Sequence, residues 1–290
     1  MKGLARGGPG ELDVRVARAA ALETTADAPQ PLAFLRAVLE RQRDRIADPV
    51  VQAAAEEVGA DALANRLVER FPLLDLHAGI PAMDAEIRAS VAALSASDAA
   101  PQPLIDAGGD LVARSEEERA TLIGSWLDDT SLLDPRLALW VRVGAAPVLE
   151  VAASPTGMVA REEWTGPACP VCGDVPQCSA IVEESGGFLQ GAPRYLVCGR
   201  CAGWWAFARA VCTHCGEDNS TRLGAFVAEG RPWARIDACD TCRGYIKTFD
   251  LRQKEARDVV PIVDDVATLS LDVWAHEKGL RRSGLSLAGV

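Results

Sequence analysis

Apolar positions recur at helical spacing through the first half of the chain. They repeat every three to four residues, which is the period of one face of an α-helix. The clearest run consists of Phe34, Leu35, Val38 and Leu39. Residues 31–155 are therefore predicted to form an all-helical domain, preceded by a mixed segment over residues 1–30.

Capping residues mark several helix boundaries. Asp48 followed by Pro49 predicts a helix start, because an aspartate accepts hydrogen bonds from the first amides and proline fits the first helical position. Ser115 and Glu118 have the spacing of a capping box. The helical pattern that Gly59 interrupts resumes at Leu63, Leu67 and Val68.

The pattern changes once the helical region ends. Short runs rich in aromatic and β-branched residues, over residues 195–197 and 245–249, predict strands. The helical period returns after Pro261, where Asp264 or Asp265 is expected to cap a C-terminal helix.

Nine cysteines lie in the strand-rich region, and eight of them form four Cys-x-x-Cys pairs. The pairs are Cys169/Cys172, Cys198/Cys201, Cys212/Cys215 and Cys239/Cys242. Gaps of 25, 10 and 23 residues separate them. Two intervening residues let a tight turn aim both sulfurs at one ion, and a gap of about 15–25 residues allows a hairpin to bring a second turn opposite. The first two pairs are thus predicted to hold one metal ion and the last two a second ion.

An internal repeat supports this grouping. CPVCG at 169–173 corresponds to CTHCG at 212–216, and RYLVCGRCAGWWAF corresponds to RIDACDTCRGYIKTF. The repeat aligns Arg194 with Arg235, Gly203 with Gly244, and Trp204 with Tyr245.

The chemistry of four thiolates suits zinc and iron equally. A site that four protein ligands fill stabilises a fold or transfers an electron, and it does not activate water. Redox-active dithiols are the rival interpretation, which the duplication among strands disfavours. His77, His214 and His276 lack partners typical of catalysis, and Cys178 is interpreted as a small, partly buried thiol, with a reactive thiol as the alternative. We therefore expect no enzymatic activity.

Composition narrows the environment and the partners. The 290-residue chain carries a net charge of −11, of which residues 1–160 contribute −9 (15 Lys and Arg against 24 Asp and Glu). This charge disfavours a nucleic-acid partner, so the Trp204-Trp205 pair is interpreted as core or interface packing. No apolar run of about 18 residues and no secretory signal are recognised, which predicts a cytoplasmic protein without a membrane span.

Residues 169–290 resemble the formate dehydrogenase accessory protein family, FdhE. The resemblance rests on CPVCG, RYLVCGRCAGWW, CTHCG, CDTCRGYIKTFD and VPIVDDVATLSLDVWAHEKGLRRSG, whereas the final LSLAGV departs from the family ending. It implies an α+β protein in which a helical domain carries two tandem rubredoxin-like metal domains. It also implies iron or zinc on the eight paired cysteines, a cytoplasmic location, and contact with the catalytic subunit of a molybdenum- or tungsten-dependent formate dehydrogenase during its maturation. Asp264 and Asp265 match a paired acidic position of the family, with a capping or partner-binding role.

Three hypotheses about function follow: a maturation factor, a rubredoxin-like electron-transfer protein, and a zinc-ribbon nucleic-acid binder, which the charge disfavours. Removal of the metal ions is expected to unfold the two cysteine-rich ribbons and to spare the N-terminal helices.

The predicted partner-binding residues are Asp264, Asp265, Trp204 and Trp205. The predicted units after the helical domain are a first ribbon over 165–209, a second over 210–252, and a C-terminal helix and tail over 260–290.

Overall fold

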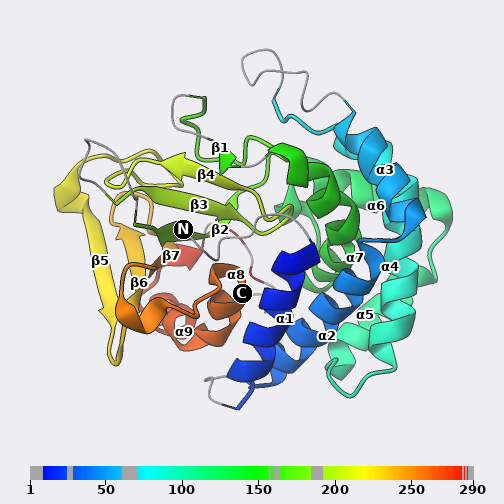
Figure 1. Ribbon diagram of the computed structural model, residues 1–290, viewed down its shortest axis with the longest axis horizontal. Helices are drawn as coiled ribbons and strands as arrows, with labels where there is room; N and C mark the ends of the chain where they lie inside the picture. Colours follow the sequence, from blue (N-terminus) through cyan, green and yellow to red (C-terminus); the bar gives the residue numbers. More distant parts are fainter. Residues whose placement is uncertain are drawn as a thin grey trace.

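The protein has the predicted α+β fold, with the helices of its N-terminal half gathered on one side and its strands on the other (Figure 1). The computed structural model describes residues 9–24, 29–60, 71–156, 158–159, 163–183, 192–282, 284 and 286. The helices of the N-terminal half are α1 (Pro9–Leu22), α2 (Pro29–Arg45), α3 (Pro49–Gly59), α4 (Ile80–Ser95), α5 (Gln102–Val112), α6 (Glu116–Asp128) and α7 (Pro135–Ala153). Short 3-10 turns lie at Leu76–Gly79, Thr130–Leu132 and Ser154–Thr156.

Local capping chemistry sets the helix starts that the sequence predicts. The Asp48 carboxylate accepts a hydrogen bond from the Val50 amide at 2.9 Å, and α3 begins at Pro49. The side chain and backbone of Ser115 exchange hydrogen bonds with Glu118, which confirms the capping box of α6. The pattern predicted to resume over residues 63–68 lies outside the described residues.

Helix α7 is the central core helix. It packs against α2, α3, α4, α5 and α6, and α4 approaches it closely at Gly144. A Cβ atom at that position would lie 2.6 Å from the Ile87 backbone. Among the described residues, the segment Pro135–Thr156 is the one helix long and apolar enough to cross a membrane, which the sequence analysis did not anticipate. Because 72% of its apolar window is buried inside the protein, α7 fits the core of a folded domain.

The strands of both cysteine-rich repeats join a single mixed sheet. In the described part of the chain, eight strands pair in the order β1-β4-β3-β2-β7-β6-β5, with β8 beside β7. They are β1 (Met158–Val159), β2 (Pro176–Ile181), β3 (Arg194–Cys198), β4 (Trp204–Phe207), β5 (Leu223–Ala228), β6 (Arg231–Cys239), β7 (Gly244–Asp250) and β8 (Arg281–Arg282). The repeats meet where β2 runs parallel to β7, with Ser179 opposite Thr248.

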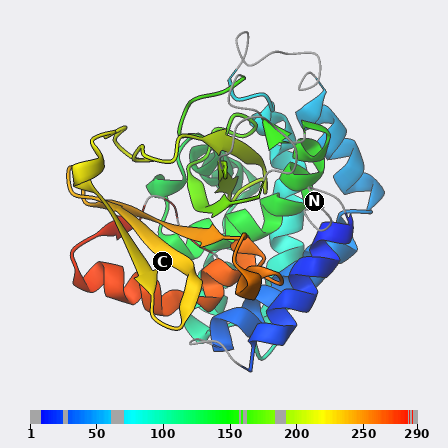
Figure 2. The same ribbon diagram turned by 60° about the vertical axis from the view of Figure 1, so that its left-hand side comes forward.

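The second repeat lies farther from the helices than the first. Its β5–β6 hairpin stands on the side of the molecule away from α1, α2 and α3 (Figure 2). Strand β5 forms one edge of the sheet, and β1 forms the other. By contrast, β2 and β3 lie in the middle of the sheet, close to the helical layer (Figure 1).

The C-terminal helical region consists of two helices and a returning strand. Helices α8 (Pro261–Ala267) and α9 (Leu269–Glu277) are separated at Thr268, and β8 then pairs with β7. The prediction that Asp264 or Asp265 caps this region is wrong, because Val260 occupies the N-cap and no side chain caps the helix. Asp264 lies inside α8 and accepts a hydrogen bond from the Val260 amide at 2.7 Å.

Buried ion pairs attach α1 to the rest of the protein. Arg15 donates to both carboxylate oxygens of Glu150 on α7, at 3.0 and 2.9 Å. Arg18 pairs with the fully buried Asp264 on α8 at 2.5 Å. The N-terminal helix therefore connects the helical layer to the C-terminal helices. The division of the chain into five segments stays a prediction. Core residues of the helices and of the first ribbon form one hydrophobic cluster.

Candidate metal centres

The first group of four cysteines lies at the boundary between the sheet and the helices. Cys169 and Cys172 flank a turn before β2, while Cys198 ends β3 and Cys201 precedes β4. The four sulfur atoms lie within 4.8 Å of one another. Cys169 Sγ is 3.7 Å from Cys201 Sγ, and Cys172 Sγ is 3.4 Å from Cys198 Sγ. All four side chains are buried, in the same hydrophobic cluster as Trp126 and Trp140 of the helical layer.

Each Cys-x-x-Cys turn is called a knuckle below. The first knuckle, from Cys169 to Cys172, is hydrogen-bonded directly to the helical domain. The amides of Leu73 and Leu74, which follow α3, donate to the carbonyls of Pro170 and Val171 at 3.1 and 3.0 Å. Those two carbonyls belong to the turn between Cys169 and Cys172. The position of this cysteine-bearing turn therefore depends on the helical layer.

Arg200 attaches the second knuckle of this group to α6. It lies between Cys198 and Cys201, and its guanidinium donates to the carbonyls of Trp126, Leu127 and Cys172 at 3.0, 3.1 and 3.2 Å. The guanidinium also stacks over the Trp126 ring at 4.6 Å. Although burial alone would lower the pKa of Arg200, the carboxylate of Asp174 and the neighbouring thiols raise it above its ordinary value. Arg200 is thus charged and buried next to the first sulfur group.

Replacing Arg200 with methionine is expected to destabilise the protein by about 3 kcal/mol, because three buried carbonyls lose their donor. Urea unfolding of the metal-loaded protein measures this change. The matched control is Arg257→Met, since Arg257 is exposed and its one ion pair with a described residue is with the exposed Asp258. Wild-type stability of the Arg200→Met protein would contradict the anchoring role.

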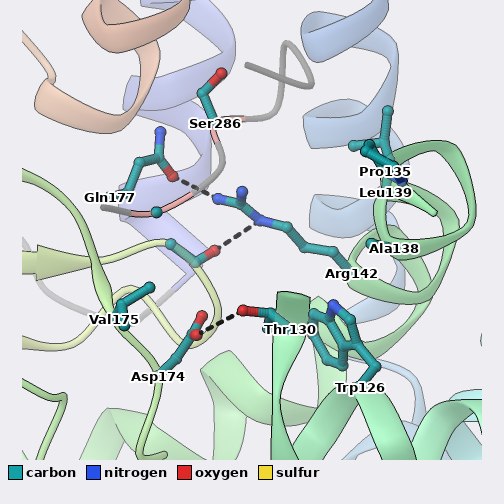
Figure 3. A pocket seen from close by; sticks show the side chains of 12 residues that line it. Trp126, Thr130, Pro135, Ala138, Leu139, Arg142, Asp174, Val175, Gln177 and Ser286 are labelled. Atoms are coloured by element: carbon teal, nitrogen blue, oxygen red, sulfur yellow. Dashed lines mark hydrogen bonds between the residues drawn. The ribbon is translucent and has the colours of Figure 1, made fainter. Parts of the chain in front are cut away.

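A second arginine holds the same knuckle from α7. Arg142 Nε donates to the Gly199 carbonyl at 3.0 Å, and its Nη2 donates to the side-chain oxygen of Gln177. Arg142 is one of the residues that line a cavity of about 30 Å³. Figure 3 shows Arg142 reaching toward Gln177, with Thr130 and Asp174 paired below it. Burial lowers the pKa of Arg142. The turn between Cys198 and Cys201 is therefore fixed by two arginines: Arg142 on α7 and Arg200 within the turn itself.

The second group of four cysteines lies at the more exposed end of the sheet. Cys212 Sγ is 3.7 Å from Cys242 Sγ, and Cys215 Sγ is 3.7 Å from Cys239 Sγ. All four sulfurs again lie within 4.8 Å of one another. Cys215 is exposed and Cys239 is buried, with the other two half-buried. A hydrogen bond of 2.5 Å from the Thr241 hydroxyl to Glu217 joins the two knuckles.

The two groups repeat the same backbone geometry. Gly173 and Gly216, which follow the first knuckles, have φ values of +79° and +77°. The residues after the second knuckles, Ala202 and Arg243, have φ values of 57° and 60°. Such left-handed conformations are costly for residues other than glycine, so their recurrence indicates a shared structural requirement of the turns. The internal repeat is therefore a repeat of structure as well as of sequence.

The donor set of each group fits a tetrahedral ion. Four sulfurs at about 2.3 Å from such an ion lie about 3.8 Å apart, close to the measured separations of 3.4 to 3.7 Å. Backbone amides also donate to the sulfurs, from Arg200 to Cys198 and from Gly244 to Cys242, both at 3.3 Å. Hydrogen bonds among the four thiols raise the pKa of Cys201, and burial raises that of Cys198. A divalent cation would replace the protons that these thiols otherwise retain. Each group could hold one metal ion; zinc and iron fit equally.

The four residues predicted to bind a partner have buried side chains. Asp264, Asp265 and Trp205 have no exposed surface, and Trp204 is 7% exposed. Trp205 belongs to the cluster shared with the helices, and its indole donates to the Gly166 carbonyl at 3.2 Å. In this conformation the four side chains stabilise the interior, so a partner would contact other residues first.

The remaining candidates lie outside both sulfur groups. The His77 ring is exposed and bonds to Asp128 at 2.9 Å, while His214 and His276 are also exposed. Cys178 is fully buried in β2, and burial raises the pKa of its thiol well above the ordinary value, as expected of an unreactive thiol. The sequence analysis missed Arg142 and Arg200. The position of Arg200 between two predicted ligands was the one available signal.

Comparisons with known proteins agree with the resemblance noted in the sequence. Residues 210–288 match a family model described as FdhE, C-terminal domain. A protein named FdhE homolog from Aquifex aeolicus is 32% identical over 169 residues, covering 58% of this chain and 57% of that protein. The FdhE homolog of Shewanella oneidensis is 40% identical over 111 residues, covering 38% of this chain and 34% of that protein. The matched region thus spans just over half of one relative's length and about a third of the other's.

The fold is similar to that of a solved structure over nearly the whole chain. The crystal structure of the FdhE protein from Pseudomonas aeruginosa aligns with a TM-score of 0.66. The alignment covers 98% of this chain and 96% of that chain, at 22% sequence identity. At this identity the match shows the shared fold of the helical layer and the sheet.

Proposed function

Because the chain is similar to the FdhE C-terminal domain and to curated FdhE homologues, we propose that it is a member of the FdhE family and a metal-binding accessory protein required for the assembly of active formate dehydrogenase. The observation that carries the proposal is the pair of four-thiol groups on the FdhE fold. We propose that Cys169, Cys172, Cys198 and Cys201 bind one ion and that Cys212, Cys215, Cys239 and Cys242 bind the other. The protein acts in the cytoplasm and binds the catalytic subunit of a molybdenum- or tungsten-dependent formate dehydrogenase.

Binding without turnover is the mechanism that the sites support. Each group supplies four thiolates, so an ion held there has no open position for water or substrate. The first site joins the ribbon to the helices through Arg142 and Arg200. The second site fixes the exposed end of the sheet, where a partner has access. The metal ions would thus maintain the shape of a docking protein.

Complementation tests this function. A bacterium that lacks its own FdhE protein would receive the wild-type gene, the Cys212→Ser/Cys215→Ser variant, or the matched control Cys178→Ala. We expect formate-dependent dye reduction with the wild type and the control, and little or none with the double variant. The catalytic subunit should likewise co-purify with the wild type and the control, and little or not at all with the double variant. A folded double variant that restores full activity would show that the second metal site is not needed.

Exposure of the second site favours electron transfer as a second candidate function. Cys215 is exposed, and amides of His214 and Gly244 donate to Cys212 and Cys242 at 3.4 and 3.3 Å. Hydrogen bonds to sulfur and solvent exposure tune the reduction potential of an iron–thiolate site. Metal replacement separates the two functions, because zinc cannot change its oxidation state. If protein loaded with zinc alone supports formate dehydrogenase assembly, electron transfer is excluded.

A further inference from the structure

A cavity lies between the two repeats, beside the second metal site. Its volume is about 200 Å³, several times the roughly 30 Å³ that one water molecule occupies in the liquid. Its lining comes from the segment that joins the two ribbons, from strands β5, β6 and β7, and from Arg194 of β3. Cys212 and Cys239, one from each knuckle of the second site, form part of the wall.

Positive charge predominates in the lining of this cavity. Arg194, Arg209 and Arg235 line it together with one carboxylate, that of Asp237. Both oxygens of Asp237 already have donors: Arg235 Nε at 2.7 Å and the Thr248 hydroxyl at 2.6 Å. Formally the wall carries two more positive than negative charges, apart from the cysteines.

Arg194 is the most deeply buried of the three arginines. It is 3% exposed, and its Nε donates to the Ser179 hydroxyl at 3.2 Å. Its Nη1 makes long contacts with the carbonyls of Ala208 and Val211, at 3.5 and 3.3 Å. The nearest oxygen of Asp237 lies 3.9 Å from its Nη2, beyond hydrogen-bonding distance. Burial lowers the pKa of Arg194, and Asp237 opposes this only in part. A buried guanidinium therefore retains an unused donor at the edge of the cavity.

The other two arginines also line the cavity. Arg209 is exposed and makes no hydrogen bond or ion pair with any described residue. Arg235 is the repeat equivalent of Arg194, so equivalent positions of the two repeats converge on one cavity. We propose that this cavity binds a small oxyanion, a carboxylate or a tetrahedral oxyanion, between Arg194, Arg209 and Arg235. The planar guanidinium groups suit such ligands because they donate paired hydrogen bonds to two oxygens.

The competing explanation is that the arginines only balance the charge of the metal site. Four thiolates around a divalent ion carry a formal charge of −2, and Cys212 and Cys239 lie in the same wall. Under that explanation the cavity has no affinity for a free anion. The two explanations therefore differ in a direct binding measurement.

Calorimetric titration of the metal-loaded full-length protein tests the proposal. The probes are sodium formate, phosphate and sulfate, each at fixed ionic strength set with sodium chloride. We expect at least one probe to bind with one-to-one stoichiometry. Arg209→Gln should weaken that binding at least about tenfold, because a charged hydrogen bond is lost. This variant is not expected to disturb folding, since Arg209 has no partner among the described residues.

The matched control removes another exposed arginine elsewhere on the surface. Arg257→Gln changes the net charge by the same amount, and Arg257 is not among the residues that line the cavity. Its affinity for the probe should equal that of the wild type. Failure of all three probes to bind the wild type overturns the proposal. So does an Arg209→Gln variant that binds as tightly as the wild type, or an equal loss in both variants, which would indicate a general effect of charge.

Discussion

Replacing Cys198 and Cys201 with serine is expected to unfold the helical layer together with the first ribbon. The first sulfur group lies in the same hydrophobic cluster as residues of α6 and α7, including Trp126 and Trp140. Structural zinc binding supplies about 10–16 kcal/mol in small domains, whereas whole domains are stable by only about 5–15 kcal/mol. Loss of the first ion should therefore abolish the cooperative fold, in contrast to the earlier expectation that the helices are spared. Far-UV circular dichroism and urea unfolding measure the loss.

The corresponding change at the second site provides the comparison. Cys212→Ser/Cys215→Ser removes two ligands from the site whose cysteines are more exposed. Amide hydrogen exchange should lose protection in β5, β6 and the start of β7, and protection in α4 and α7 should persist. Wild-type helix content and cooperativity in the Cys198→Ser/Cys201→Ser protein would refute the shared core.

Local chemistry explains what the sequence could predict. The capping residues Asp48 and Ser115 accept hydrogen bonds from amides only two or three positions along the chain. Their effect can therefore be predicted from a short stretch of sequence. The same holds for the helical period and for the Cys-x-x-Cys turns. The grouping of the cysteines follows from the spacing and the repeat, and the sulfur positions match that grouping.

Long-range pairing explains what the sequence could not predict. The single sheet depends on the parallel contact of β2 with β7, where Ser179 lies opposite Thr248 far along the chain. No local pattern encodes that register, so the two ribbons were expected as separate units. The role of Arg200 was hidden for the same reason, since the carbonyls of Trp126 and Leu127 lie more than seventy positions before it.

The acidic pair in the C-terminal region shows that a charged residue in the sequence need not be exposed in the folded protein. Asp264 and Asp265 resemble surface residues in sequence, yet both are fully buried. Their counterions come from three distant elements: Arg18 on α1, Lys247 on β7, and Arg282 on β8. A buried carboxylate is tolerable only when such partners are in place, and only the folded structure reveals them.

Replacing Asp265 with alanine is expected to destabilise the protein by about 3–5 kcal/mol, the usual cost of leaving buried charges unpaired. Its carboxylate lies 3.0 Å from Lys247 Nζ and 2.5 Å from Arg282 Nη2, and it accepts a hydrogen bond from Gln177 at 2.7 Å. After the substitution, Lys247 and Arg282 would share only the carboxylate of Asp272. Urea unfolding of metal-loaded protein at neutral pH measures the difference.

The pH dependence of this effect follows from the ionisation of Asp265. Burial opposes ionisation, but the charges of Arg282 and Lys247 hold the pKa of Asp265 below its ordinary value. The stabilisation is therefore complete above the ordinary aspartate pKa of about 3.9 and is lost as the pH falls through the lower folded-state value. The difference between the wild type and Asp265→Ala should accordingly be constant from neutral pH down to about pH 5.

Two further variants separate charge from shape. Asp258→Ala removes an exposed aspartate whose one ion pair within the described part of the chain is with the exposed Arg257. It should leave the stability near that of the wild type, because surface ion pairs contribute little. The double variant Asp265→Leu/Lys247→Met removes a buried negative and a buried positive charge together, so Arg282 keeps Asp272 as its partner. It should recover part of the stability that Asp265→Ala loses, since apolar replacements of buried pairs are often tolerated. If the double variant is instead less stable than Asp265→Ala, the hydrogen bonds of Lys247 to the Asp265 and Thr268 carbonyls matter more than charge balance.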